Sequence, residues 1–244
     1  MDKSLHLAMQ AQPDDTTCGP TCLHAVYDYF DDPLPLEQVI RETPALEEGG
    51  TLAVLLGRHA LRRGYAARIY TYNLRVFDPT WFKRPLSPQE LTARIRAQLA
   101  VKTSPRLHRA SAGYIEFLEL GGEILMQDLT ASLLRGYLER AVPILTGLSA
   151  TYLYQCEREI GPQCTPDDIK GFPCGHFVVL CGYGKEDQKV RVADPYIRNP
   201  LAGEHHYEVD LERLVCAILL GVLTYDANLL ILEPKSREGM DSRE

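Results

Sequence analysis

From residue 143 onward, the sequence consists largely of short apolar segments separated by hairpin-length turns. Segments of this length bounded by Pro, Gly and Asp predict β-strands, and the short turns predict antiparallel pairing. The expected strands cover residues 144–153, 177–183, 189–193 and 228–232, with an earlier one at 67–72. A mainly antiparallel sheet is therefore the expected centre of the fold.

The first 140 residues favour helices instead, because apolar residues recur there at spacings of three and four. The predicted helices cover residues 18–30, 51–63, 87–101, 105–119 and 130–140, with a later one at 208–214. Thr51 is an expected N-cap, and Ser87 with Glu90 is an expected capping box. Helices followed by strands indicate an α+β fold. We expect one domain over residues 1–234, with a helical insertion around 80–140, and a frayed tail at 235–244.

The composition is that of a soluble globular protein, with 45% apolar and 24% charged residues. A net charge of -7 argues against a nucleic-acid partner, since neutralising phosphates requires an excess of Lys and Arg. The longest nearly apolar run, 214–225, is shorter than the roughly 20 residues that cross a bilayer. Residues 1–10 lack the apolar stretch of a signal peptide, and seven cysteines do not suggest a disulfide framework. We expect a cytoplasmic protein with no membrane partner.

Cys18 stands at the predicted start of the first helix, within the motif formed by residues 12–20. The free N–H groups and the positive dipole end of a helix N-terminus favour a thiolate, which is the nucleophilic form of cysteine. Gly19 is expected to let backbone or substrate come close at the position where an acyl group would sit. The Gln12 amide, six residues before Cys18, is an expected oxyanion donor together with the Cys18 N–H.

A second motif supplies the partners of such a thiolate. His176 precedes the predicted strand 177–183, and Asp194 follows the predicted strand 189–193. If residues 182–188 form the turn of a hairpin, these two side chains lie beside each other at one edge of the sheet. A cysteine nucleophile needs an imidazole as base, and the imidazole needs an orienting group. We therefore predict a catalytic triad of Cys18, His176 and Asp194.

Residues 12–20, 175–180 and 192–196 together resemble the bacteriocin-processing peptidase-like family, which comprises double-glycine leader peptidases and their stand-alone relatives. Its pattern is a glutamine, a Cys-Gly six residues later that opens a helix, a Gly-His strand and an Asp-Pro turn. Gln12, Cys18, His176 and Asp194 match that pattern. The resemblance implies a papain-like fold and a thiol protease. The sequence departs from the exporter-linked members, since it has no transporter segments, and residues 154–174 look like an insertion beside the site.

The resemblance implies that a peptide or amide bond is hydrolysed through a thioester acyl-enzyme, with no cofactor and no metal. Two alternatives stay open. The same site could transfer the acyl group to an amine or thiol, or the chain could be a non-catalytic domain that grips a peptide in the same cleft. Likeness to stand-alone members associated with ATP-grasp amino-acid ligases points to such a ligase as a partner.

Each motif also has a structural interpretation. Cys18 could be a buried structural cysteine, His176 a core histidine, Asp194 a turn residue before Pro195, and Gln12 a loop residue with no chemical role.

The remaining cysteines and histidines are expected to be structural. Four cysteines lie near His176 but lack the close Cys-x2-Cys spacing of a zinc site; they are Cys156, Cys164, Cys174 and Cys181. Cys22 is expected in the core, one helical turn after Cys18. His205 and His206 are expected as an exposed strand or loop pair.

Overall fold

The computed structural model describes residues 3–46, 49–161 and 163–235. Its strands are β1 (Lys3–Ser4), β2 (Tyr65–Thr71), β3 (Glu123–Leu125), β4 (Ile144–Ser149), β5 (Glu159–Ile160), β6 (Thr165–Pro166), β7 (Gly175–Tyr183), β8 (Lys189–Ala193), β9 (His206–Asp210) and β10 (Asn228–Pro234). The expected strand at 189–193 is confirmed, and those at 67–72, 177–183 and 228–232 are confirmed with small shifts of their ends.

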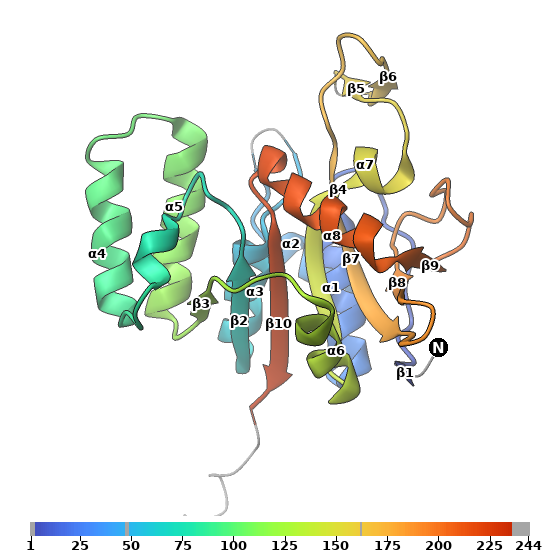
Figure 1. The fold of residues 1–244 in the computed structure, drawn as a ribbon, viewed down its shortest axis with the longest axis horizontal. Coiled ribbons are helices and arrows are strands. Elements are labelled where there is room, and N and C mark those ends of the chain that lie inside the picture. Colours follow the sequence, from blue (N-terminus) through green and yellow to red (C-terminus); the bar gives the residue numbers. More distant parts are fainter. Residues whose placement is uncertain (1–2, 47–48, 162, 236–244) are drawn as a thin grey trace, which may run out of the picture.

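Within this part of the chain, eight strands form one sheet in the order β3-β2-β10-β4-β7-β8-β9, and β1 pairs with the end of β7. All neighbouring strands are antiparallel except β2 and β3, which are parallel. β5 and β6 form a separate hairpin that projects from the top of the molecule in Figure 1. The expected α+β fold with a mainly antiparallel sheet is confirmed.

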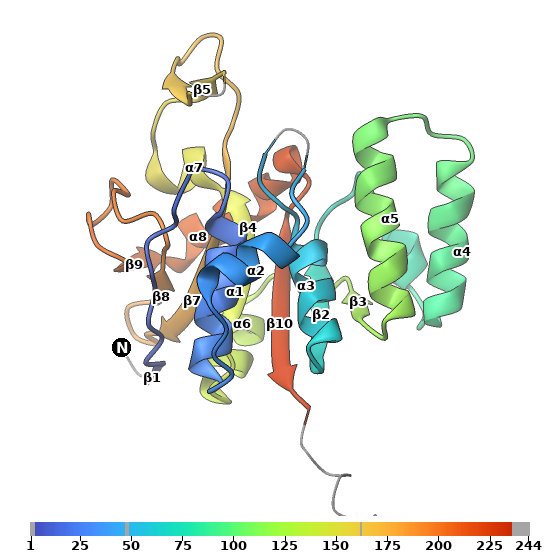
Figure 2. The ribbon, with the colours of Figure 1, turned by 180° about the vertical axis from the view of Figure 1, so that it is seen from behind.

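The helices are α1 (Cys18–Tyr29), α2 (Leu36–Glu42), α3 (Ala53–Arg62), α4 (Pro88–Leu99), α5 (Pro105–Glu119), α6 (Ala131–Glu139), α7 (Ala150–Tyr154) and α8 (Leu211–Leu220), with short 3₁₀ turns η1 (Pro79–Phe82) and η2 (Gly221–Thr224). Helices α1 and α3 cover one face of the sheet, and α6 and α8 cover the other (Figures 1 and 2). Helices α4 and α5 lie to one side, where α5 packs against α3. That they form an insertion into a single domain stays a prediction. Most of the expected tail, residues 236–244, lies outside the described residues.

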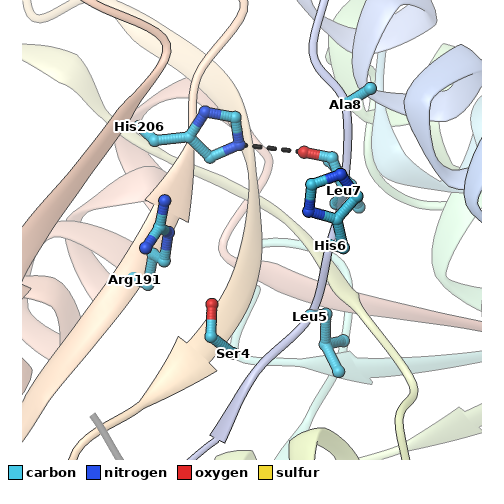
Figure 3. Close-up of a pocket in the computed structure, with 7 residues that line it drawn as sticks. All are labelled: Ser4, Leu5, His6, Leu7, Ala8, Arg191 and His206. Carbon is cyan, nitrogen blue, oxygen red and sulfur yellow. Dashed lines mark hydrogen bonds between the residues drawn. The ribbon is translucent and has the colours of Figure 1, made fainter.

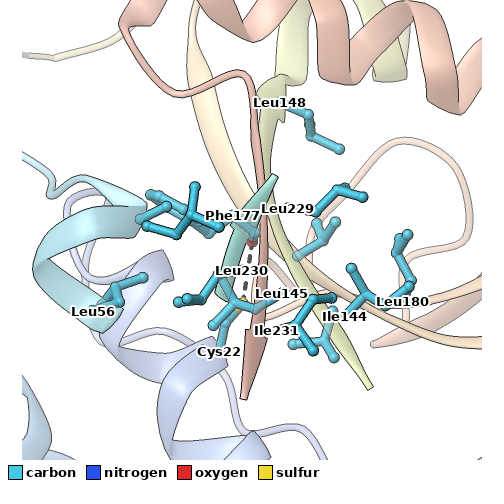
Figure 4. Close-up of a cluster of buried hydrophobic side chains, with 14 of the residues drawn as sticks. Cys22, Leu56, Ile144, Leu145, Leu148, Phe177, Leu180, Leu229, Leu230 and Ile231 are labelled. Carbon is cyan, nitrogen blue, oxygen red and sulfur yellow. Dashed lines mark hydrogen bonds between the residues drawn. The ribbon is translucent and has the colours of Figure 1, made fainter. Parts of the chain in front are cut away.

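One part of the core lies between α1, α3 and the central strands β4, β7 and β10 (Figure 4), and the same buried cluster includes side chains of α6 and α8 on the other face of the sheet. Cys22 is fully buried there and its thiol donates to the Phe177 carbonyl at 3.3 Å, so its expected place in the core is confirmed. Gly19 allows close packing of α1, and its expected role of letting backbone or substrate come close to the site stays a prediction. A Cβ on Gly19 would lie 2.5 Å from Thr51 Cγ2 and 3.2 Å from the Phe177 ring, so only glycine lets the first turn of α1 pack this closely.

Helices whose ends are encoded locally match the expectation. α5 has the expected bounds, and Ser87 with Glu90 forms the capping box of α4. The N-cap of α3 is Leu52 and not Thr51. The first N–H of the helix, that of Ala53, instead donates to both carboxyl oxygens of Asp226 at 3.1 Å. A side chain distant in sequence has therefore replaced the local cap.

Two predicted elements exist but with other bounds than expected. The strand expected at 144–153 ends at Ser149, because the Ser149 hydroxyl accepts from the Tyr152 N–H and begins α7. The helix expected at 208–214 begins only at Leu211, because β9 continues to Asp210 as a partner of β8. In the described part of the chain, no helix is both long and apolar enough for a membrane span.

Candidate active site

The hairpin of β7 and β8 brings His176 and Asp194 together. His176 is the second residue of β7 and Asp194 directly follows β8. Their Nε2 and Oδ1 atoms lie 2.8 Å apart, and the two side chains are 8% and 0% exposed. Ala193, the residue before Asp194, pairs with Val179 and not with a residue next to His176. The pairing of the two strands also shifts by one residue between Leu180 and Gly182. The two residues are therefore neighbours, as the hairpin predicted, although the strands are staggered.

Asp194 accepts four hydrogen bonds although it is fully buried. Its Oδ1 accepts from His176 and from the Tyr196 N–H at 2.8 Å, and its Oδ2 accepts from the hydroxyls of Tyr154 and Tyr207 at 2.6 and 2.7 Å. Burial raises the pKa of Asp194, but the interaction with His176 and the donated hydrogen bonds outweigh burial and lower it. The carboxyl is thus held in its ionised form.

Cys18 is the first residue of α1, and α1 packs against β7 next to His176. Burial lowers the pKa of His176, but the Asp194 carboxylate and a hydrogen bond with the Cys18 side chain outweigh it and raise that pKa to about 10. Because Nε2 is engaged by Asp194, Nδ1 is the ring nitrogen left to exchange a proton with the thiol.

Gln12 lies on the same side of the molecule, since its backbone N–H donates to the Pro195 carbonyl at 3.0 Å. Its side-chain Nε2 donates to the Asp14 carbonyl at 2.9 Å, and its Oε1 is buried with no partner among the described residues. The amide is therefore close to the triad but donates to the backbone. Nε2 carries a second N–H besides the one donated to Asp14, and the expected role of Gln12 as an oxyanion donor stays a prediction.

A cleft of about 520 Å³ opens over this group. Gln12 and His176 line it, together with Tyr154 and Tyr196. Cys18, 7% exposed, is not among its lining residues in the described part of the chain. We expect a substrate carbonyl to reach the sulfur between the Gln12 and His176 side chains.

The segment between α7 and β7 forms another wall of the cleft. It therefore lies beside the site, as expected from the sequence. It carries the β5–β6 hairpin, and its end is fixed to α7 because the Cys174 N–H donates to Thr151 Oγ1 at 2.9 Å. The Cys174 thiol donates to Glu159 at 2.7 Å. Among the described residues, no group of three or more His, Cys, Asp or Glu side chains could hold a metal ion.

Sequence patterns gave no signal for Tyr154 and Tyr207, and they misplaced the histidine pair. His205 and His206 are half-buried and not exposed: His205 is hydrogen-bonded to the Asp194 carbonyl at 2.6 Å and His206 to the Leu7 carbonyl at 2.9 Å. A buried ionised carboxylate requires donors. That rule predicts that partners of Asp194 exist but not which elements supply them.

A second cavity, of about 460 Å³, lies between residues 4–8 and the strands β8 and β9 (Figure 3). Arg191 and His206 face it, and none of the four expected site residues lines it. The bond from His206 to Leu7 holds the N-terminal segment that leads to Gln12. None of the described residues that line this cavity lines the cleft, so the two are separate.

No family model matches the chain, and no curated protein matches it in sequence. Solved structures do match. One from Bacillus anthracis, named as a C39-like peptidase, has a TM-score of 0.51 and 12% identity, over 96% of this chain and 99% of that one. A double-glycine-motif protease of an AMS/PCAT transporter, solved with its leader peptide, has a TM-score of 0.45 and 14% identity, over 96% and 95%.

Xylellain, a cysteine protease from Xylella fastidiosa, has a TM-score of 0.44 and 14% identity, over 96% of this chain and 85% of that one. The match to the Bacillus anthracis structure bears on the fold and not on the reaction. The chain thus shares its fold with that C39-like peptidase structure, in agreement with the resemblance inferred from the three motifs.

Proposed function

We propose that this protein is a cysteine peptidase or amidohydrolase that acts through a thioester acyl-enzyme. The observation that supports it is a buried imidazole held between the Cys18 side chain and the Asp194 carboxylate. A thiol, an imidazole and a carboxylate in this order can activate a nucleophile and return its proton to a leaving group. The fold shared with the Bacillus anthracis structure agrees with this chemistry.

The reaction would proceed in two halves. The Cys18 thiolate attacks the substrate carbonyl carbon, and the electron pair moves onto the carbonyl oxygen, where the Cys18 N–H and the Gln12 amide donate to it. The His176 imidazolium then gives its proton to the leaving amine as the C–N bond breaks. In the second half, His176 removes a proton from water, the resulting hydroxide attacks the thioester, and the C–S bond breaks.

The substrate would be a peptide or amide that fits the cleft. We also propose that the enzyme works in the reducing cytoplasm, an inference supported by seven free thiols. The structures named above do not support an ATP-grasp ligase as a partner, so the proposal includes no such partner. Transfer to an amine instead of water would use the same acyl-enzyme.

The test compares wild type with Cys18→Ala, His176→Ala and, as a control, the exposed Cys216→Ala. Cleavage of a peptide library is followed by mass spectrometry, with and without an added amine. We expect turnover only in wild type and Cys216→Ala, and a transfer product with the amine would show acyl transfer. Cleavage by Cys18→Ala would refute the proposal.

Alkylation gives a second test that needs no substrate. Burial raises the pKa of five other thiols and keeps them protonated at neutral pH; these are Cys22, Cys156, Cys164, Cys174 and Cys181. We therefore expect iodoacetamide to modify Cys18 first in the Cys216→Ala background, with peptide mapping as the measurement. Equal modification of all the thiols would contradict an activated Cys18.

A further inference from the structure

We propose that Tyr154 and Tyr207 are positioning residues of the triad, which hold Asp194 ionised and aimed at His176. The inference rests on the proposed function, because the two hydroxyls would act on the reaction through Asp194, whose charge keeps His176 protonated. Neither residue belongs to the motifs that carry the family resemblance.

The two oxygens of Asp194 accept from different partners. Oδ1 accepts from the imidazole at 2.8 Å, and Oδ2 accepts from both tyrosine hydroxyls, at 2.6 and 2.7 Å. Tyr154 comes from the end of α7 and Tyr207 from β9, so Oδ2 is fixed from two directions by separate elements. A carboxylate fixed at one oxygen can rotate little about its C–C bond, so Oδ1 stays directed at Nε2.

The hydroxyls also set the charge of the site. A fully buried carboxyl without donors takes up a proton, and a neutral Asp194 would no longer stabilise the imidazolium. Hydrogen bonds to a charged group are among the strongest that a protein makes. Two of them on one oxygen add to the effect of His176 in lowering the pKa of Asp194 against the effect of burial. Loss of either hydroxyl should therefore make Asp194 bind a proton at a higher pH.

The two tyrosines differ in one useful respect. Tyr154 lines the cleft, so its substitution can also alter substrate binding, whereas Tyr207 is not among the described residues that line it. Tyr207→Phe therefore isolates the effect on Asp194. A matched control is Tyr72→Phe, because the Tyr72 hydroxyl is buried and has no partner among the described residues.

The experiment measures the rate at which iodoacetamide modifies Cys18 between pH 3 and 10. This rate reports the thiolate whatever substrate the enzyme takes. We expect the acid limb of the profile to move upward by about one pH unit in Tyr207→Phe and in Tyr154→Phe. Tyr72→Phe should follow the wild type. In turnover of a cleaved peptide, Tyr207→Phe should lower kcat about tenfold and leave KM unchanged.

The outcomes separate the two proposals. If the wild type shows no reactive Cys18 at neutral pH, the proposed function fails. If the wild type is reactive and the profiles of both tyrosine variants coincide with it, the positioning role is overturned and the proposed function stands. Circular dichroism checks the fold. If Tyr207→Phe does not fold, Tyr154→Phe decides the question alone, since its hydroxyl contacts the same oxygen.

Discussion

A carboxyl with no solvent exposure normally holds a proton, and Asp194 avoids this because four donors surround it. The consequence passes to His176. Burial by itself would favour a neutral imidazole, and only the charge of Asp194 together with Cys18 reverses the effect. The protonation state of His176 thus depends on the charge of the Asp194 carboxylate.

Asp194→Asn tests this dependence. The imidazole stays buried but loses the neighbouring charge, so the pKa of His176 should fall from about 10 to below its ordinary range. We expect turnover to drop by roughly 10²- to 10⁴-fold, and alkylation of Cys18 at pH 7 to slow. The pKa of His176 is measured by NMR titration.

The control for this substitution is Asp210→Asn, since Asp210 is exposed and its side chain makes no capping hydrogen bond to α8. An Asp194→Asn variant that keeps the wild-type pKa of His176 would show that the carboxylate charge is not what holds the imidazolium.

At the scale of single residues, the sequence could predict only those parts of the site that lie in short motifs. Cys18 is recognisable from its place before Gly19 and Pro20, and His176 with Asp194 from a hairpin of the right length. Tyr154 and Tyr207 are 40 and 13 residues from Asp194. Their convergence depends on the tertiary packing of α7 and β9, which no local pattern encodes.

At the scale of the elements, the segment between α7 and β7 contributes one wall of the cleft. It presents Ile169 and Phe172, which are 78% and 73% exposed, beside a wall of the site. Exposed apolar side chains of this size next to a cleft are suited to cover an extended peptide. The element therefore offers a place where the proposed substrate would gain apolar contacts.

We expect Ile169→Ser and Phe172→Ser each to raise KM about tenfold for a cleaved peptide, because each removes an apolar side chain that binding would bury. The value of kcat and the melting temperature should not change, since both side chains are exposed. Steady-state kinetics measure the effect. Val101→Ser is the matched control, with a side chain 79% exposed and far along the chain in the α4–α5 connection. An equal KM in all three variants would argue against substrate contact.

Element boundaries follow the same division between local and distant causes. Ser87 and Glu90 cap α4 within one turn of helix, so the sequence predicts the start of that helix. The end of β4 at Ser149 and the extension of β9 to Asp210 could not be predicted in this way. An apolar run such as 144–153 suits a strand or a short helix, and the side-chain cap and the neighbouring strand decide which one forms.

At the scale of the whole molecule, Asp226 links three elements of the fold. Its carboxyl lies under Gly147 of β4, accepts from the first N–H of α3, and accepts from the Asn228 amide at the start of β10. Burial raises the pKa of Asp226 to about 7, against opposing contributions from Asn228, Ala53 and Arg106. The folded protein therefore binds a proton here that the unfolded chain releases near pH 4.

The sign of the effect on stability follows. Between about pH 4 and 7 the folded state holds more protons at Asp226 than the unfolded state, so this residue lowers stability as the pH rises, by roughly 1.4 kcal/mol per pH unit. Asp226→Asn cannot ionise. We expect the stability of the variant relative to wild type to increase from pH 4 to 7 and then level off, as measured by urea denaturation. A constant difference across that range would contradict a buried ionisable Asp226.

The position of β10 has a consequence for how the molecule is made. This strand, residues 228–234, is hydrogen-bonded on one side to β2 and on the other to β4. Before β10 is synthesised, β2 and β4 are both edge strands with unpaired backbone N–H and C=O groups. Such edges can pair with strands of other chains and so favour aggregation. Cys18, His176 and Asp194 have all been synthesised by then, but the frame that supports them has not. The two halves of the sheet can thus be joined only once β10 has been synthesised.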